Sequence, residues 1–171
     1  MEKSIMVDIN RKEINSDALS EINDRIKSEK GFLDIINTRF DSNPVDIRTY
    51  NPLTLAFVGD CVFELIIRSI IVEKGNKSVN ALAKEKNSYV NASMQSKMAE
   101  LLKDYYTEEE AEIYRSGKNA KTANHSKSAA YNEYHKATGL EAVMGYLYLT
   151  GRSERAAELV NIAVNMIDEK N

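Results

Sequence analysis

The sequence has few of the residues that mark several classes of protein. Its 171 residues include one cysteine, two prolines, seven glycines and no tryptophan. A single cysteine excludes a disulfide framework and fits a reducing, cytoplasmic setting, as does an N-terminus without a signal-peptide pattern. The net charge of −3 excludes nucleic-acid binding through overall charge, so any such role needs a local basic patch.

The sequence also lacks the strict alternation of apolar and polar residues that is typical of β-strands. Apolar residues recur at helical spacing instead, which predicts an all-α fold. A turn at Asp41-Ser-Asn-Pro44 predicts a boundary near residue 45. We therefore expect an N-terminal extension over residues 1–45, partly helical and of no assignable function, followed by one helical domain over residues 46–171. Within the extension, a helix is expected from residue 16 or 17 to Arg39, with a break or bend at Gly31.

One long apolar segment, residues 51–74, organises the predicted domain. Asn51 is a good N-cap, Pro52 suits the first helical position, and Gly75 is a natural stop. Apolar residues run nearly all the way round this helix, which predicts burial on most faces. Asp60 at its centre would then need a partner, because burying an unpaired carboxylate is costly.

No lysine or arginine lies one helical turn from Asp60, so either a distant residue or a cation must balance its charge. Glu64 lies four residues before Arg68, a normal helical ion pair, although a supporting role beside Asp60 stays open. The three charged residues also argue against a membrane span, since each would cost about 2.5–3.5 kcal/mol at a span's centre.

The rest of the chain predicts further helices. One helix is expected over residues 79–103 after a cap at Ser78, and Gly145 within a later helix predicts close approach of another backbone. The other expected helices begin at a Thr107–Glu110 capping box, at a Thr138–Glu141 capping box and at a cap on Ser153.

Residues 115–136 are locally basic, with five lysines and arginines and Glu133 as the only acid. Tyrosines and the two histidines, His125 and His135, are interleaved with them. Basic groups mixed with small polar donors and aromatics suit a phosphate backbone. A solvated loop has the same composition, so both interpretations stay open here.

Two acids, Asp60 and Glu141, lie on apolar helical segments and could hold Mg²⁺ for phosphodiester hydrolysis, which needs hard oxygen ligands on rigid elements. Each has a structural alternative: Asp60 could satisfy the backbone or a distant arginine, and Glu141 could complete the cap begun by Thr138. Cys61 is interpreted as a small core residue, and the spacing of the histidines does not favour a zinc site.

The segments Leu-Ala-Phe-Val-Gly-Asp60-Cys-Val-Phe-Glu64 and Leu-Glu141-Ala-Val-Met-Gly-Tyr-Leu-Tyr-Leu resemble the two signature segments of the ribonuclease III catalytic domain. With Asn51-Pro-Leu and Arg115-Ser-Gly-Lys-Asn-Ala-Lys, the chain resembles the Mini-ribonuclease III group, which has no double-stranded-RNA-binding domain. The resemblance covers about residues 46–165.

This resemblance implies an all-helical endonuclease fold, a homodimer, and Mg²⁺-dependent cleavage of double-stranded RNA in the maturation of large-subunit (23S) ribosomal RNA. It implies that Asp60 is catalytic, that Glu141 binds metal and that Phe57 contacts the partner subunit. Two acids usual in the family are replaced, by Ala56 and Thr138, so the number of metal ions is left open.

The predicted RNA-phosphate ligands are Arg115, Lys118, Asn119 and Lys121. Two other functions remain open at this stage. The first is a dimer that binds double-stranded or ribosomal RNA without cutting it, and the second is a helical protein-interaction module.

Overall fold

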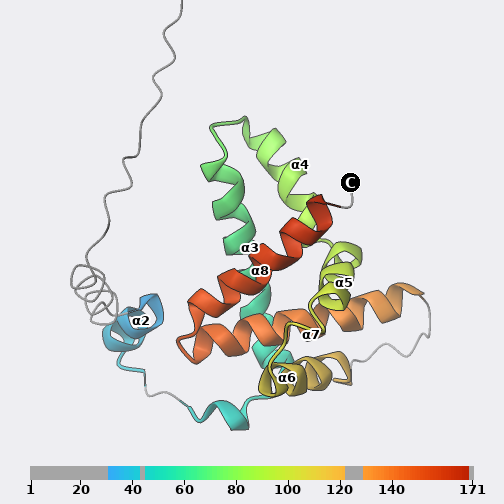
Figure 1. Cartoon of the computed structure of the whole chain (residues 1–171). Helices are drawn as coiled ribbons and strands as arrows, with labels where there is room; N and C mark the ends of the chain where they lie inside the picture. The colour runs from blue at the N-terminus through green and yellow to red at the C-terminus, as the bar shows by residue number, and fades with distance from the viewer. Residues whose placement is uncertain (1–30, 43–44, 122–128, 170–171) are drawn as a thin grey trace, which may run out of the picture. The chain divides into compact units, whose positions relative to one another are not determined.

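The computed structural model describes residues 31–42, 45–121 and 129–169, and this part of the chain is helical without a strand (Figure 1). The predicted all-α fold is therefore confirmed. A short 3₁₀ helix, Ile47–Thr49, precedes the longer helices of the second compact unit. In order, the α-helices are α2 (Phe32–Phe40), α3 (Pro52–Glu73), α4 (Val79–Val90), α5 (Ala92–Leu101), α6 (Glu108–Lys118), α7 (Ala129–Leu149) and α8 (Ser153–Asp168).

The chain divides into two compact units, residues 1–42 and residues 43–171. In the first unit, α2 begins after Gly31, whose backbone N–H donates to the Asp34 carboxylate over 3.1 Å. The expected helix before Gly31 lies outside the described residues. None of the residues of α2 is buried.

Helix α3 begins and ends as its sequence predicts. The Asn51 side chain accepts a hydrogen bond from the Leu53 N–H at 2.9 Å, Pro52 occupies the first turn, and Gly75 has a φ of 136°. The expectation of burial on most faces is wrong, because one face of α3 is exposed in the single chain. Asp60 lies among the exposed residues, so its charge is not buried in the core.

The expected single helix over residues 79–103 is two helices, α4 and α5, separated at Asn91. Asn91 has an extended backbone (ψ 151°), and its Oδ1 accepts from the Met94 N–H at 2.9 Å. Its Nδ2 also donates to the Asn87 carbonyl at 2.9 Å. Asparagine side chains can satisfy backbone groups outside a helix, and this capping offsets an interruption that the apolar spacing does not reveal.

Helix α7 begins at Ala129, well before the predicted start at Thr138. Thr138 is interior, 3 % exposed, and its hydroxyl donates to the Tyr134 carbonyl at 3.0 Å. The interpretation of Thr138 and Glu141 as a capping box is therefore wrong. The last helix is displaced by one position, since Arg152 and not Ser153 occupies the cap of α8.

The Thr107–Glu110 capping box is confirmed at the start of α6. Glu110 is almost fully buried and also accepts from Arg155 Nε at 3.0 Å, so it joins α6 to α8. A buried carboxylate needs such partners. Around these polar contacts lies one apolar core built on α3, α5, α7 and α8, with Phe63, Met98, Leu102, Met144, Leu147 and Leu159 among its most buried side chains.

Figure 1 shows α7 and α8 crossing α3, and α7 packs against α3, α5, α6 and α8. The described helices include none that is long and apolar enough to cross a membrane.

Candidate active site

Two glycines bring α3 and α7 into backbone contact. A Cβ atom on Gly59 would lie 1.7 Å from the Glu141 carbonyl oxygen, and one on Gly145 would lie 2.0 Å from the Leu55 carbonyl oxygen. Both distances are far below any possible contact, so neither position can carry a side chain without separating the helices. The close approach predicted for Gly145 is confirmed.

This crossing brings Asp60 and Glu141 together, although 81 positions separate them in the sequence. Asp60 directly follows Gly59, and Glu141 supplies the carbonyl that Gly59 approaches. The pKa of the Glu141 carboxyl is raised to about 7, first because the group is buried and second because the negative charge of Asp60 lies near. A cation bound at these two carboxylates would stabilise the ionised form of Glu141.

Gln95 of α5 is the third polar side chain of the site and was not singled out in the sequence. It is 2 % exposed and lowers the pKa of Glu141, opposite to the effects of burial and Asp60. Its Nε2 has no hydrogen bond of ordinary geometry to the described residues, so its contact with Glu141 is electrostatic rather than a well-formed hydrogen bond. The sequence does not mark Gln95 as a site residue, because it is an amide among mostly apolar residues and only the fold brings α5 beside α7.

The donor set fits a hard divalent cation held partly by water or by substrate. Asp60 and Glu141 supply carboxylate oxygens, the ligand type that Mg²⁺ prefers, and Mg²⁺ often uses only one or two carboxylates. The described residues contain no cluster of three or more candidate ligands. Ala56 is buried and Thr138 uses its hydroxyl on the backbone, so neither position replaces a missing acid.

Glu64 belongs to an ion-pair network instead. Its Oε1 accepts from Arg68 Nε at 2.7 Å and lies 3.3 Å from Lys86 Nζ of α4. The Arg68 hydrogen bond, followed by Lys86, lowers the pKa of the Glu64 carboxyl despite partial burial. The predicted pairing with Arg68 is confirmed. Cys61, by contrast, is exposed, so its interpretation as a core residue is wrong.

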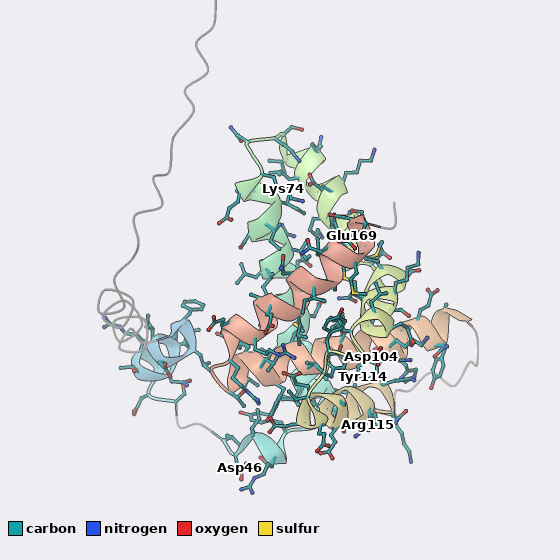
Figure 2. The ribbon with its side chains drawn as sticks, in the orientation of Figure 1. Asp46, Lys74, Asp104, Tyr114, Arg115 and Glu169 are labelled. Carbon is teal, nitrogen blue, oxygen red and sulfur yellow. The ribbon has the colours of Figure 1, made fainter. Side chains whose placement is uncertain are left out.

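The predicted RNA-binding residues gather at the end of α6. Arg115, which Figure 2 labels on that helix, and Asn119 and Lys121 are exposed, while Lys118 is half-buried. None of the three cations forms an ion pair within the described residues. Lys136, in contrast, lies 2.8 Å from Glu100, an acid partner that it shares with Lys103. His125 and Lys127 lie outside the described residues.

The end of α6 lies against the turn of α7 that carries Glu141. A Cβ atom on Gly117 would lie 2.7 Å from the Ala142 Cβ and 3.0 Å from the Thr138 carbonyl oxygen. Arg115, Asn119 and Lys121 also line an open hollow of about 620 Å³ beside the first residues of α3. A run of unpaired cations therefore flanks the acidic pair.

Phe57, predicted at a dimer interface, is 77 % exposed on α3. Leu65 and Val72 lie on the same side of the helix and are 61 % and 58 % exposed. Cys61 and Arg68 fall between them at helical spacing. These residues form an exposed stripe of unusually apolar character, and we call it the α3 stripe.

Comparison with known proteins relates this geometry to a family. Residues 53–152 match the model of the Ribonuclease III domain. The chain is 40% identical over 143 residues to the Mini-ribonuclease 3 of Thermoanaerobacter sp. (strain X514), covering 84% of this chain and 99% of that protein. It is 37% identical over 127 residues to the Mini-ribonuclease 3 of Clostridium tetani, covering 74% of this chain and 84% of that protein.

A crystal structure of a protein from Fusobacterium nucleatum is also similar. Its sequence identity is 36%, its TM-score is 0.61, and the match covers 70% of this chain and 96% of that one.

The matched domain is that of a helical RNA endonuclease, a class that acts on double-stranded RNA and generally uses a divalent metal. The chain belongs to the ribonuclease III family and, within it, to the Mini-ribonuclease 3 group.

Proposed function

We propose that this chain is a Mg²⁺-dependent endoribonuclease that cuts double-stranded RNA as a homodimer and matures the precursor of 23S ribosomal RNA. The observation that carries the proposal is the contact between Gly59 and the Glu141 backbone, which brings together the helix turns that carry Asp60 and Glu141. Burial and, after it, the negative charge of Asp60 raise the pKa of the Glu141 carboxyl there.

Asp60 and Glu141 would hold the metal. Bound Mg²⁺ would polarise a phosphoryl oxygen, lower the pKa of its water and neutralise the leaving oxygen. The two carboxylates would repel the phosphodiester locally, and a bound cation would offset that repulsion at the phosphate to be cut. Gln95 of α5 lowers the pKa of Glu141, and both acids lie on helices rather than on loops.

The basic end of α6 would position the duplex. Arg115, Lys118, Asn119 and Lys121 offer cations and an amide to backbone phosphates, and the cations have no acid partners among the described residues. A-form RNA exposes phosphates and 2′-hydroxyls more readily than base edges, so recognition should follow shape more than sequence. Affinity should fall steeply with salt, because each phosphate contact releases counterions.

The homodimer is supported by the α3 stripe. Three large apolar side chains exposed on one face of a helix that begins beside the site favour a protein partner over water. A second copy of the chain would cover the stripe in an isologous contact.

The deciding experiment compares wild type with Asp60→Asn and Glu141→Gln on a perfect RNA duplex, with Mg²⁺ and with EDTA. Both substitutions keep side-chain volume and remove a charge that the metal needs, so we expect cleavage to fall by at least about 100-fold while duplex binding in EDTA persists. Lys136→Gln is the matched control, since Lys136 already pairs with Glu100.

Cleavage by either folded variant at the wild-type rate would remove the two acids from the proposed metal site. Duplex binding by the wild type without cleavage under any divalent metal would instead favour a non-catalytic RNA-binding dimer. The ribosomal role needs a separate assay, in which deletion of the gene should leave unprocessed precursor of the large-subunit RNA.

A further inference from the structure

A second cavity lies at the other side of the basic residues, between the end of α6 and the beginning of α7. It measures about 340 Å³ and is lined by Lys118, Asn119, Lys121, Tyr131, Asn132 and His135, together with Ala120. Two lysines, two amides and an imidazole line it, and no carboxylate of the described residues does. Such a lining favours an anion with several acceptor oxygens.

His135 is the feature of this cavity that calls for a ligand. The side chain is 8 % exposed, yet neither Nδ1 nor Nε2 has a hydrogen-bond partner in the described part of the chain. Leaving buried polar atoms unpaired costs free energy, and a neutral imidazole offers one donor and one acceptor. Both nitrogens are also shielded from solvent, so a bound group with oxygen acceptors would reach the donor after a side-chain shift of the kind that is common on binding.

Two tyrosines hold the imidazole in place. The Tyr131 ring centroid lies 4.2 Å from that of His135, and the Tyr134 centroid lies 5.7 Å away, both in edge-on arrangements. The ring is therefore oriented by packing on its own helix rather than by hydrogen bonds. An oriented but unpaired polar group is what a binding site requires before its ligand arrives.

The charges around the cavity are available for binding. Lys118 and Lys121 have no acid partner among the described residues, whereas Lys136, the residue after His135, is held by Glu100 at 2.8 Å. Lys136 thus has an acid partner, which it shares with Lys103, whereas the two lysines that line the cavity have none among the described residues.

We propose that this cavity binds a phosphate group of the RNA backbone, with an imidazole N–H of His135 donating to a phosphoryl oxygen. Lys118 and Lys121 neutralise the charge of that phosphate, and the Asn119 and Asn132 amides can donate to the same group or to its ribose. The volume is about ten times the share of one liquid water, about 30 Å³, so it admits a phosphate with its sugar. The inference rests on the proposed RNA-cleaving function and adds a subsite away from the acidic pair.

The test records the ring resonances of the full-length protein by NMR in EDTA, where no cleavage is expected. The chain has two histidines, so the resonances of His135 are assigned by their loss in His135→Gln. Inorganic phosphate and a short RNA duplex are titrated separately, and duplex affinity is measured for wild type, His135→Phe, His135→Gln and Lys136→Gln. His135→Phe fills the same space without a donor, and His135→Gln restores one.

We expect the duplex to shift the His135 ring resonances, and inorganic phosphate to shift them at much higher concentration. Loss of a hydrogen bond to a charged group should weaken duplex binding about ten-fold in His135→Phe. His135→Gln should recover part of this loss, and Lys136→Gln should bind like wild type. In a Lys121→Gln variant, the slope of the logarithm of affinity against the logarithm of salt concentration should fall by about the share of one phosphate contact.

The outcomes separate this inference from the proposed function. If the duplex binds wild type and His135→Phe equally and leaves the ring resonances unmoved, the subsite is wrong while the endonuclease proposal stands. If phosphate shifts His135 but the duplex does not bind, the cavity serves a small phosphate compound and the RNA subsite is again wrong. If neither ligand moves the ring, the cavity is not a phosphate site.

Discussion

At the scale of single residues, Glu141 has an environment that makes stability depend on pH. Its pKa in the folded protein is raised to about 7, so the fold binds this proton more tightly than the unfolded chain does. The stabilising effect of the proton is complete below the unfolded pKa of about 4.3 and is lost as pH rises to about 7. Above pH 7 the ionised carboxylate therefore destabilises the metal-free protein.

We accordingly expect Glu141→Gln to be more stable than wild type at pH 8 in EDTA, by about 1–2 kcal/mol after allowance for partial exposure. The difference should shrink toward pH 5, where the wild-type carboxyl is largely protonated. Urea unfolding at the two pH values measures this. Glu133→Gln, on the same helix, is the control. An equal difference at both pH values would show that the carboxyl does not titrate in this range.

The sequence identified both acids of the candidate site but not their surroundings. Asp60 and Glu141 stand out by chemistry in apolar segments, and a family resemblance assigns them roles. Neither the raised pKa of Glu141 nor the nearby Gln95 is visible in the chain, because each depends on groups from another helix. The sequence shows His135 within a basic, aromatic segment, but its orphaned nitrogens are known only once its neighbours are placed.

At the scale of helices, the α3–α7 crossing depends on Gly59. Alanine normally favours a helix interior over glycine by about 1 kcal/mol. At position 59 the new Cβ would lie 1.7 Å from the Glu141 carbonyl oxygen, and helix backbones cannot move aside as a flexible side chain can. We expect Gly59→Ala to destabilise the protein by at least about 1–3 kcal/mol and to lower cleavage more than stability alone explains.

Thermal unfolding and duplex cleavage below the melting temperature would measure the two effects of this change. Ser69→Ala is a matched control, because Ser69 is exposed on the same helix and its hydroxyl contacts only the Leu65 carbonyl. A Gly59→Ala protein as stable and as active as wild type would mean that the helices tolerate separation at this point.

Helix boundaries followed from the sequence where local caps decide them. The Asn51 cap of α3 and the Thr107–Glu110 box of α6 involve side chains within three residues of each other. The start of α7 did not follow, since Thr138-x-x-Glu141 has the spacing of a capping box inside a longer helix. There Thr138 bonds the Tyr134 carbonyl, an interaction that only an existing helix provides. The same spacing thus has two meanings, and context chooses between them.

At the scale of the whole molecule, the α3 stripe should control assembly. We expect Phe57→Asp to yield monomers, because the aspartate that replaces this exposed ring would place a charge in the stripe. That charge would be desolvated in any contact between copies. Sedimentation at several concentrations measures the state. Tyr105→Asp is the control, since Tyr105 is also an exposed ring, at 45 %, but lies between α5 and α6. A wild-type protein that is monomeric throughout would contradict the proposed dimer.

We further propose that residues 46–171 form the catalytic domain and that residues 1–45 are an extension. No residue of α2 is buried, and the chain divides between residues 42 and 43. The alignment with the Clostridium tetani protein leaves about a quarter of this chain unmatched, and the longer one with the Thermoanaerobacter protein leaves about a sixth, so relatives match the extension only in part. Removing the extension should therefore expose little apolar surface in the part that remains.

A protein of residues 46–171 should melt within a few degrees of the full chain and cut the same duplex at a similar rate, because the core residues and both acids are retained. Removal of residues 1–51 is the informative comparison, since it also deletes the Asn51 cap, whose Oδ1 accepts from the Leu53 N–H. Loss of the cap alone should cost about 1 kcal/mol, and the same deletion also removes Ile47 and Tyr50, which pack against the core. If the shorter deletion already lowers the melting temperature by ten degrees or more, the extension packs on the domain and contributes to its core. If melting is unchanged but cleavage falls, the extension acts on the RNA rather than on the fold.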